Sequence, residues 1–188
     1  MTFMGDSNYN HYRGGLTKYK ENLLAVGGSD PSLGQVLGNK KTEIMKIEDN
    51  KNSSWSVVEP DIKFSQGEEI YSHSLVTVKS SGINEEYVLL IGGHFAWYLA
   101  IEDVFKFNGT WFPFGKLGEP RRYHNSIYWN GAVYVTGGWY ENSTNTKMEI
   151  WKIEDSPDKF KTKENWPELF SWDKPHVFVV PDSFFPDY

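Results

Sequence analysis

The sequence predicts an all-β fold built from repeated four-stranded antiparallel sheets. The first observation is a short apolar run that ends on a glycine pair and occurs three times. The second is the Asn130-Gly131 pair between two β-rich runs, which is the strongest short-range signal for a hairpin. The third is a strand of alternating polar and apolar residues after each glycine pair. A pattern that recurs along the chain predicts one structural unit per repeat.

The glycine pairs end the runs at residues 22–28, 87–93 and 132–138. Glycine at such a position permits a positive φ angle and the close approach of a neighbouring backbone. We therefore expect a structural role for these glycines, which are Gly27, Gly28, Gly92, Gly93, Gly137 and Gly138.

A histidine lies upstream of each glycine pair, and a fourth histidine opens a later apolar run. These histidines are His11, His73, His124 and His176. We expect them to occupy equivalent positions on separate units, too far apart to hold one metal ion, and to bind a neighbouring loop by hydrogen bonds.

Downstream of each glycine pair, the sequence predicts a loop, an alternating strand, a turn and a strand with an aromatic residue. The alternating strands are residues 42–47, 102–107 and 147–153. The strands that follow them are residues 55–58, 111–114 and 160–162. Trp55 and Trp111 are the aromatic residues of the first two, and we expect both to be structural repeat residues.

These features together resemble the kelch repeat, which has a period of roughly fifty residues. Residues 120–124 (PRRYH) also look like the arginine and histidine that lead into the innermost strand of a kelch unit. The resemblance covers nearly the whole chain and implies blades of a β-propeller, arranged around a channel. The chain departs from the pattern where a tyrosine is usual and where the third tryptophan is expected. The first departure is at Ile47, Phe107 and Ile153, and the second is at Phe160, unless Trp166 serves instead.

The resemblance implies that residues 1–188 form a single partial propeller. Its units cover about 11–58, 70–114 and 121–164, with an extra strand at about 176–180. Propellers usually have roughly four to eight blades, so three units and a strand do not close a ring by ordinary geometry. The sequence leaves three explanations open: a fragment of a larger protein, an open array capped by its own ends, or a ring that self-association with a second chain completes.

Composition argues against several classes of protein. A net charge of −6 disfavours nucleic-acid binding, which needs a basic surface. The absence of cysteine excludes disulfides and thiolate metal sites, and it favours a reducing, cytoplasmic location. The sequence shows neither a membrane-spanning apolar run nor a signal-peptide pattern. Three Asn-X-Ser/Thr motifs fall in predicted turns, where backbone geometry also favours Asn and Ser, so their glycosylation stays open.

The sequence carries no convincing catalytic motif. Adjacent acidic residues such as Glu85 and Glu86 point to opposite faces of a strand, so they do not form an acid/base pair. A nucleophile elbow and a phosphate-binding glycine loop are both missing. We therefore expect no enzymatic activity, no cofactor and no metal.

Arginine and aromatic residues in the loops indicate a binding face. Arg121 and Arg122 can bind a carboxylate through paired hydrogen bonds. The simpler interpretation of these arginines is a surface ion pair with Glu119. Exposed aromatic residues beside arginine are typical of interface hot spots, although some of them could instead pack over their own sheet. The predicted partner-binding residues are Arg121, Arg122, Tyr123, His94, Phe95, Trp97, Tyr98, Trp139 and Tyr140.

The resemblance implies an adaptor or scaffold module that binds another protein or a peptide through loops on one propeller face. Two alternatives remain. One is a carbohydrate-active or oxidase-like kelch enzyme, which would need a dense polar cluster at the channel. Only Arg121, His124, His73 and His94 come near such a cluster. The other is an inactive fragment of a larger kelch protein.

Overall fold

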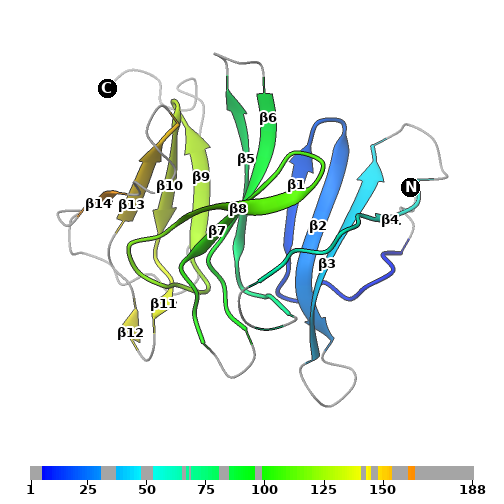
Figure 1. Ribbon diagram of the computed structural model, residues 1–188, viewed down its shortest axis with the longest axis horizontal. Coiled ribbons are helices and arrows are strands. Elements are labelled where there is room, and N and C mark those ends of the chain that lie inside the picture. The colour runs from blue at the N-terminus through cyan, green and yellow to red at the C-terminus, as the bar shows by residue number, and fades with distance from the viewer. Residues whose placement is uncertain are drawn as a thin grey trace, which may run out of the picture.

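All regular structure in the described part of the chain is β-sheet. The computed structural model describes residues 6–30, 37–47, 53–64, 67, 69–80, 85–95, 99–140, 143–144, 148–153 and 161–163. These residues form three four-stranded antiparallel sheets that stand side by side, with a small two-stranded sheet next to the third (Figure 1). Within these ranges, the chain forms no helix long and apolar enough to cross a membrane.

Each large sheet follows the predicted order of four consecutive strands, apart from the inserted hairpin in the third. Sheet 1 contains β1 (Gly15–Tyr19), β2 (Asn22–Asp30), β3 (Leu37–Lys46) and β4 (Ser56–Val57). Sheet 2 contains β5 (Ser74–Ser80), β6 (Glu85–Ile91), β7 (Asp103–Phe107) and β8 (Trp111–Lys116). Sheet 3 contains β9 (Asn125–Trp129), β10 (Ala132–Thr136), β13 (Met148–Lys152) and β14 (Lys161–Lys163). The inserted hairpin is β11 (Trp139–Tyr140) with β12 (Ser143–Thr144).

Two local features differ from the sequence prediction. The segment from Ser29 to Lys41 was predicted as a loop, but β2 and β3 extend into both of its ends. A register shift between Val26 and Gly28 lets the ladder continue, with Gly28 opposite Asn39. The segment after the third glycine pair, predicted as a loop, contains the paired strands β11 and β12.

In sheets 2 and 3 the glycine pair follows the end of the second strand, as predicted, whereas β2 continues past its glycine pair to Asp30. All six glycines have positive φ angles. Gly92 shows why a side chain is excluded there. A Cβ atom on Gly92 would lie 2.7 Å from the Arg121 carbonyl oxygen and 2.9 Å from Cε1 of His124. Both groups belong to the segment that leads into sheet 3, so the glycine allows the next sheet to approach.

The strand register makes positions comparable between sheets. Gly15, Ser74 and Asn125 are equivalent because each pairs with the residue just before the first glycine of its sheet. It follows that His73 and His124 are equivalent to each other, and that Gly14 holds this position in sheet 1. The prediction that His11 shares their position is therefore wrong. His11 lies three residues earlier, where sheets 2 and 3 carry Ile70 and Arg121, and His176 lies outside the described residues.

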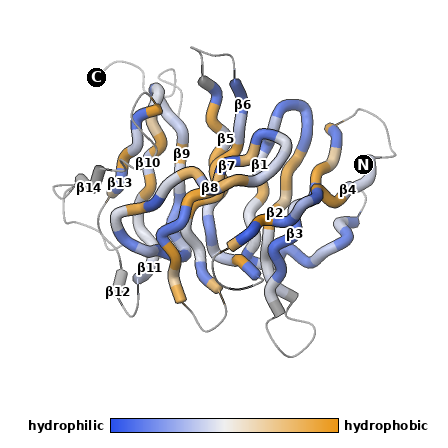
Figure 2. Tube along the Cα trace, viewed as in Figure 1, coloured by the Kyte–Doolittle hydropathy of each residue, from blue (hydrophilic) through white to orange (hydrophobic). Residues whose placement is uncertain are grey.

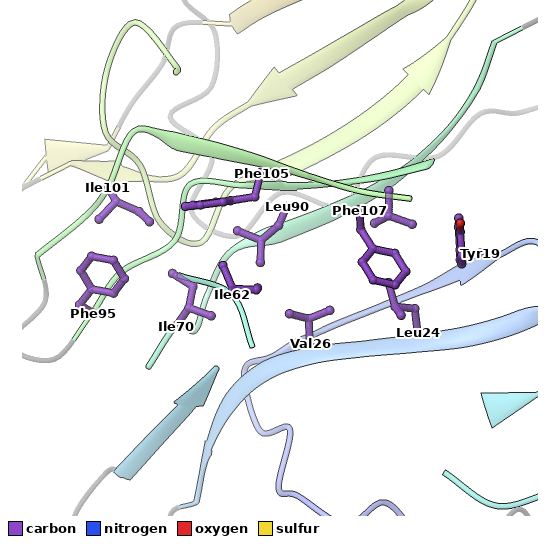
Figure 3. Close-up of a cluster of buried hydrophobic side chains, with 11 residues drawn as sticks. Tyr19, Leu24, Val26, Ile62, Ile70, Leu90, Phe95, Ile101, Phe105 and Phe107 are labelled. Carbon is purple, nitrogen blue, oxygen red and sulfur yellow. The ribbon is translucent and has the colours of Figure 1, made fainter. Parts of the chain in front are cut away.

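Two apolar clusters hold the three sheets together. Cluster 1, between sheets 1 and 2, contains Tyr19, Leu24, Val26, Ile62, Ile70, Val88, Leu90, Phe95, Ile101, Phe105 and Phe107 (Figure 3). Cluster 2, between sheets 2 and 3, contains Val76, Val78, Tyr87, Leu89, Ile91, Val104, Leu117, Val133, Val135 and Trp151. Val88 to Ile91 of β6 are four consecutive buried apolar residues (hydrophobic residues are orange in Figure 2). Because successive side chains of a strand point to opposite faces, apolar side chains reach both faces of sheet 2. Burial of each large apolar side chain contributes roughly 1.5–3 kcal/mol, so these two layers account for the stacking of the sheets.

The two tryptophans predicted as repeat residues lie at the outer strands. Trp111 begins β8, packs against cluster 1, and donates a hydrogen bond from Nε1 to Oγ1 of Thr42 in sheet 1 at 2.8 Å. Trp55 directly precedes β4, and its side chain is half-buried. Phe160 and Trp166, which were considered for the third unit, lie outside the described residues.

Candidate functional site: the loop face

Two loops of each sheet meet at one end of the strands. One loop leads into the innermost strand, and the other follows the glycine pair. An isolated β-bridge joins them in each sheet, and the three bridges occupy equivalent positions. The bridges are Tyr12–Ser29, Tyr71–His94 and Arg122–Trp139. The sheets therefore present the same pair of loops on one side of the molecule.

Backbone hydrogen bonds connect these loops from sheet to sheet. The Ser72 amide donates to the Arg13 carbonyl at 2.7 Å, and the Tyr123 amide donates to the Ser72 carbonyl at 2.9 Å. All three residues have positive φ angles, of 59° at Arg13, 55° at Ser72 and 56° at Tyr123. Such angles are uncommon outside glycine, so their recurrence shows that the three loops share one backbone conformation.

Arginine and aromatic side chains gather over this row of backbones. The guanidinium carbons of Arg13 and Arg122 lie 5.8 Å and 5.9 Å from the ring centre of Tyr123. The Arg13 guanidinium also lies 5.1 Å from the Tyr12 ring. Distances near 6 Å allow a favourable interaction between a cation and an aromatic ring. We define the loop face as Tyr12, Arg13, Arg122, Tyr123, Trp139 and Tyr140.

The loop face is accessible to a partner. Tyr12 is 50% exposed and Tyr140 is 37% exposed, and Arg13 is also exposed. Arg122, Tyr123 and Trp139 are half-buried. Four of the predicted partner-binding residues, Arg122, Tyr123, Trp139 and Tyr140, therefore lie where a partner could touch them. Trp97 and Tyr98 lie outside the described residues.

Three of the residues predicted to contact a partner are buried, so the prediction is wrong for them. Arg121 and His94 have no exposed surface, and Phe95 is 5% exposed within cluster 1. The ring of His94 packs edge-on against Tyr71, with centroids 4.0 Å apart. These side chains support the loops from below and do not offer a surface to a partner.

Arg121 pairs with the buried Glu149 of β13, and the charge of Glu119 also acts on it. Its Nη2 donates to Oε1 of Glu149 at 2.6 Å, and its Nη1 donates to the Gly137 carbonyl at 3.1 Å. Oε2 of Glu149 accepts from the Gly118 amide at 2.6 Å. Burial lowers the pKa of the Arg121 guanidinium, while the Glu149 carboxylate acts against this effect. The pair therefore fixes the loop that leads into β9.

His11 forms the corresponding contact in sheet 1. Its Nε2 lies 2.9 Å from Oε2 of Glu43 in β3. The Glu43 carboxylate also accepts the amides of Asn8 and Tyr9, at 2.9 Å and 3.0 Å. Burial alone would raise the pKa of Glu43, but the hydrogen bonds outweigh burial and hold it below its usual value.

The histidines under the loop face are buried and neutral at neutral pH. Burial, assisted by nearby His11, lowers the pKa of His73 to about 3. Burial and the charges of Arg122 and Arg13 lower the pKa of His94 to about 3. Burial also holds the pKa of His124 well below its ordinary value, and its Nε2 lies 2.8 Å from Oγ of Ser74. In the described ranges, no three or more His, Asp or Glu residues gather closely enough to hold a metal ion.

Tyr12 and Arg13 are functional candidates that sequence reasoning missed. They precede β1 by the same distance at which Arg122 and Tyr123 precede β9, so the signal was present in the sequence. The mistaken alignment of His11 with His73 and His124 hid it, because that alignment placed Tyr12 and Arg13 inside the strand. The complete loop face can bind by cation–aromatic contact and by charge-assisted hydrogen bonds from its arginines.

Comparison with known proteins supports the fold. No protein-family model matches the sequence, and no curated protein matches it either. Among solved structures, the chain is similar to that of YjhT, a kelch-repeat propeller protein, with a TM-score of 0.63 and 16% sequence identity. The match covers 87% of this chain and 48% of the YjhT chain, so the chain spans about half the length of this structural relative. The chain thus has the fold of kelch-type propeller blades, as three blade-like antiparallel sheets.

Proposed function

We propose that this protein is a non-enzymatic interaction module of the cytoplasm that binds another protein or a peptide through the loop face. The observation that carries the proposal is the convergence of Arg13 and Arg122 on the Tyr123 ring from two different sheets. Arginine and aromatic residues on a rigid support are enriched among residues that dominate binding energy. The sheet-to-sheet hydrogen bonds described above supply the rigid support.

The buried polar groups below the loop face support binding over catalysis. Arg121 is bound to Glu149, and His124 is bound to Ser74. These contacts hold loops in place, so two of the four side chains that the competing enzyme alternative would use, Arg121 and His124, have structural partners. Arg13 and Arg122 have a suitable chemistry for recognising carboxylates of an acidic peptide.

The proposal can be tested by panning a displayed peptide library on the full chain and measuring the affinity of enriched peptides. Arg122→Ala and Tyr140→Ala should each weaken binding by about tenfold or more, because hot-spot truncations cost about 2 kcal/mol. Ile47→Ala is the control, since Ile47 is 48% exposed and directly follows β3 at the opposite end of the sheet from the glycine pair.

The proposal predicts that Ile47→Ala leaves the affinity unchanged and that all variants keep the near-ultraviolet circular dichroism of the parent. Peptides that bind the two loop variants as tightly as the parent would overturn the assignment of the loop face.

A further inference from the structure

The contact between neighbouring sheets is one interface used twice. The Gly28 amide donates to the Ile70 carbonyl at 2.8 Å, and the Gly93 amide donates to the Arg121 carbonyl at the same distance. Gly28 and Gly93 hold equivalent positions in their sheets, and so do Ile70 and Arg121. Each sheet therefore has a trailing face, which packs on the following sheet, and a leading face, which packs on the preceding one.

Equivalent residues on the trailing faces differ in exposure. Tyr19, Val78 and Trp129 each pair with the residue five positions before the first glycine of their sheet. Tyr19 is 4% exposed in cluster 1, and Val78 is fully buried in cluster 2. Trp129, on the trailing face of sheet 3, is 55% exposed. The same position is thus buried between sheets 1 and 2 and between sheets 2 and 3, but it is exposed on the outer face of sheet 3.

The leading faces show the same contrast at the other end. Leu16 of sheet 1 is 63% exposed, whereas its equivalent Leu75 in sheet 2 packs against cluster 1. Ser126, the equivalent in sheet 3, is 9% exposed. In Figure 1, sheets 1 and 3 stand at opposite ends of the row, with sheet 2 between them. The two open faces therefore carry the two halves of the interface that is already formed twice within the chain.

We propose that two copies of this chain close a six-sheet ring, in which the trailing face of sheet 3 packs on the leading face of sheet 1 of the partner. Trp129 would then take the place of Tyr19, which packs against Phe107 of the following sheet, and the partner subunit's Leu16 would take the place of Leu75, which lies against Gly15 of the preceding sheet. The same contact occurs twice in the ring, and burial of large apolar residues at both contacts favours closure.

The ring size argues for a second copy as the occupant. Six sheets lie within the usual range of roughly four to eight blades. The structural match also assigns 87% of this chain to 48% of the YjhT propeller, which is close to half a ring. Two identical halves related by a two-fold axis give closed symmetry, the commonest arrangement of soluble oligomers.

Light scattering during gel filtration of the full chain tests the proposal. We expect a single species with twice the chain mass of 21.7 kDa. Leu16→Glu and Trp129→Lys should each give a monomer, because each places a charge against an apolar surface in both contacts of the ring.

Mixing these two variants in equal amounts provides a rescue. In the mixed ring, one contact is that of the parent and the other carries both new charges, so the dimer mass should return. Leu99→Glu is the matched control, because Leu99 is 55% exposed but lies in the loop between β6 and β7 of sheet 2, so this variant should remain dimeric.

The absence of cysteine from the chain permits a second test. A chain with both Leu16→Cys and Asn125→Cys should form a covalent dimer on oxidation, because the equivalent residues Leu75 and Gly15 lie against each other, whereas either single variant should not. A parent chain that is monomeric at 21.7 kDa, or that forms larger species as concentration rises, would overturn the closed ring. Covalent dimers of the single variants would also overturn the closed ring, because they would show that each face packs against the same face of a second copy.

Discussion

His11 and Arg121 occupy the same register position in sheets 1 and 3, and each binds a buried glutamate at an equivalent position of the third strand. His11 lies 2.9 Å from Glu43, and Arg121 lies 2.6 Å from Glu149. Both side chains also reach the carbonyl of the first glycine of their sheet, at 2.5 Å and 3.1 Å. Two chemically different side chains thus fix the loop that leads into the innermost strand.

The first prediction is that Arg121→Ala strongly destabilises the protein. Glu149 would remain fully buried without its cation, and breaking such a pair typically costs about 3–5 kcal/mol. Urea unfolding followed by tryptophan fluorescence measures this loss. Lys116→Ala removes the exposed pair with Glu102, and we expect a much smaller loss of stability, because water and salt screen exposed ion pairs. Equal losses in the two variants would contradict the assignment.

The second prediction concerns replacement of the whole pair. At the positions of Arg121 and Glu149, sheet 2 carries Ile70 and Phe105, which both belong to cluster 1. The double change Arg121→Ile with Glu149→Phe should therefore recover most of the stability that Arg121→Ile alone loses. The Gly118 amide, which loses its acceptor, is exposed and can bind water.

A double-mutant cycle measures this recovery, and a coupling of about 1–3 kcal/mol in favour of the double variant is expected. A double variant whose loss equals the sum of the two single losses would falsify the equivalence between the apolar and the charged pair.

The third prediction separates backbone strain from steric exclusion at a glycine. Gly92 and Gly131 both have positive φ angles, of 55° and 75°, so an alanine at either position carries a similar backbone cost of about 1–2 kcal/mol. A Cβ atom on Gly92 would crowd the Arg121 carbonyl, whereas one on Gly131 would meet nothing within 4 Å. We expect Gly92→Ala to lower the free energy of unfolding by several kcal/mol more than Gly131→Ala does.

Thermal and urea unfolding of the two variants check this difference. If the two losses are the same, the glycine pair serves backbone conformation alone and not the approach of the next sheet.

The repeat was predictable from the sequence because its signals are local. Gly137 follows its strand directly, and the Asn130-Gly131 turn lies between the two strands that it joins. The number and order of strands in each sheet therefore followed from residues that are close in sequence.

The burial of the Arg121 and Phe95 side chains was not predictable from local sequence. Arg121 and Glu149 are 28 residues apart in the sequence, and only the register of β13 against β10 brings them together. Phe95 follows a glycine pair as an exposed loop residue would, but packing between sheets 1 and 2 buries it. Both outcomes depend on contacts between elements that the local pattern does not encode.

The last prediction is that stability falls as the pH drops below about 6.5, through the buried histidines. The folded pKa of His73 is lowered from 6.5 to about 3, so between these values the unfolded chain binds more protons than the folded one. Its contribution to stability is complete above pH 6.5 and declines toward pH 3, by about 1.4 kcal/mol for each pH unit. His124 should add to this slope, because its pKa is also lowered by burial and by the charge of Arg121.

The free energy of unfolding in urea at pH 7.5, 6.0 and 5.0 measures the slope, and this range stays above the pH at which Glu43 contributes, since its pKa lies below 4.5. His73→Gln cannot take up the proton, so its slope should be shallower than that of the parent by about 1.4 kcal/mol per pH unit at the acidic end. The slope is the decisive quantity, because a loss of packing alone would lower stability equally at every pH. An unchanged slope in this variant would mean that the imidazole of His73 is accessible to protons in the folded protein, and that burial between the sheets does not keep it neutral.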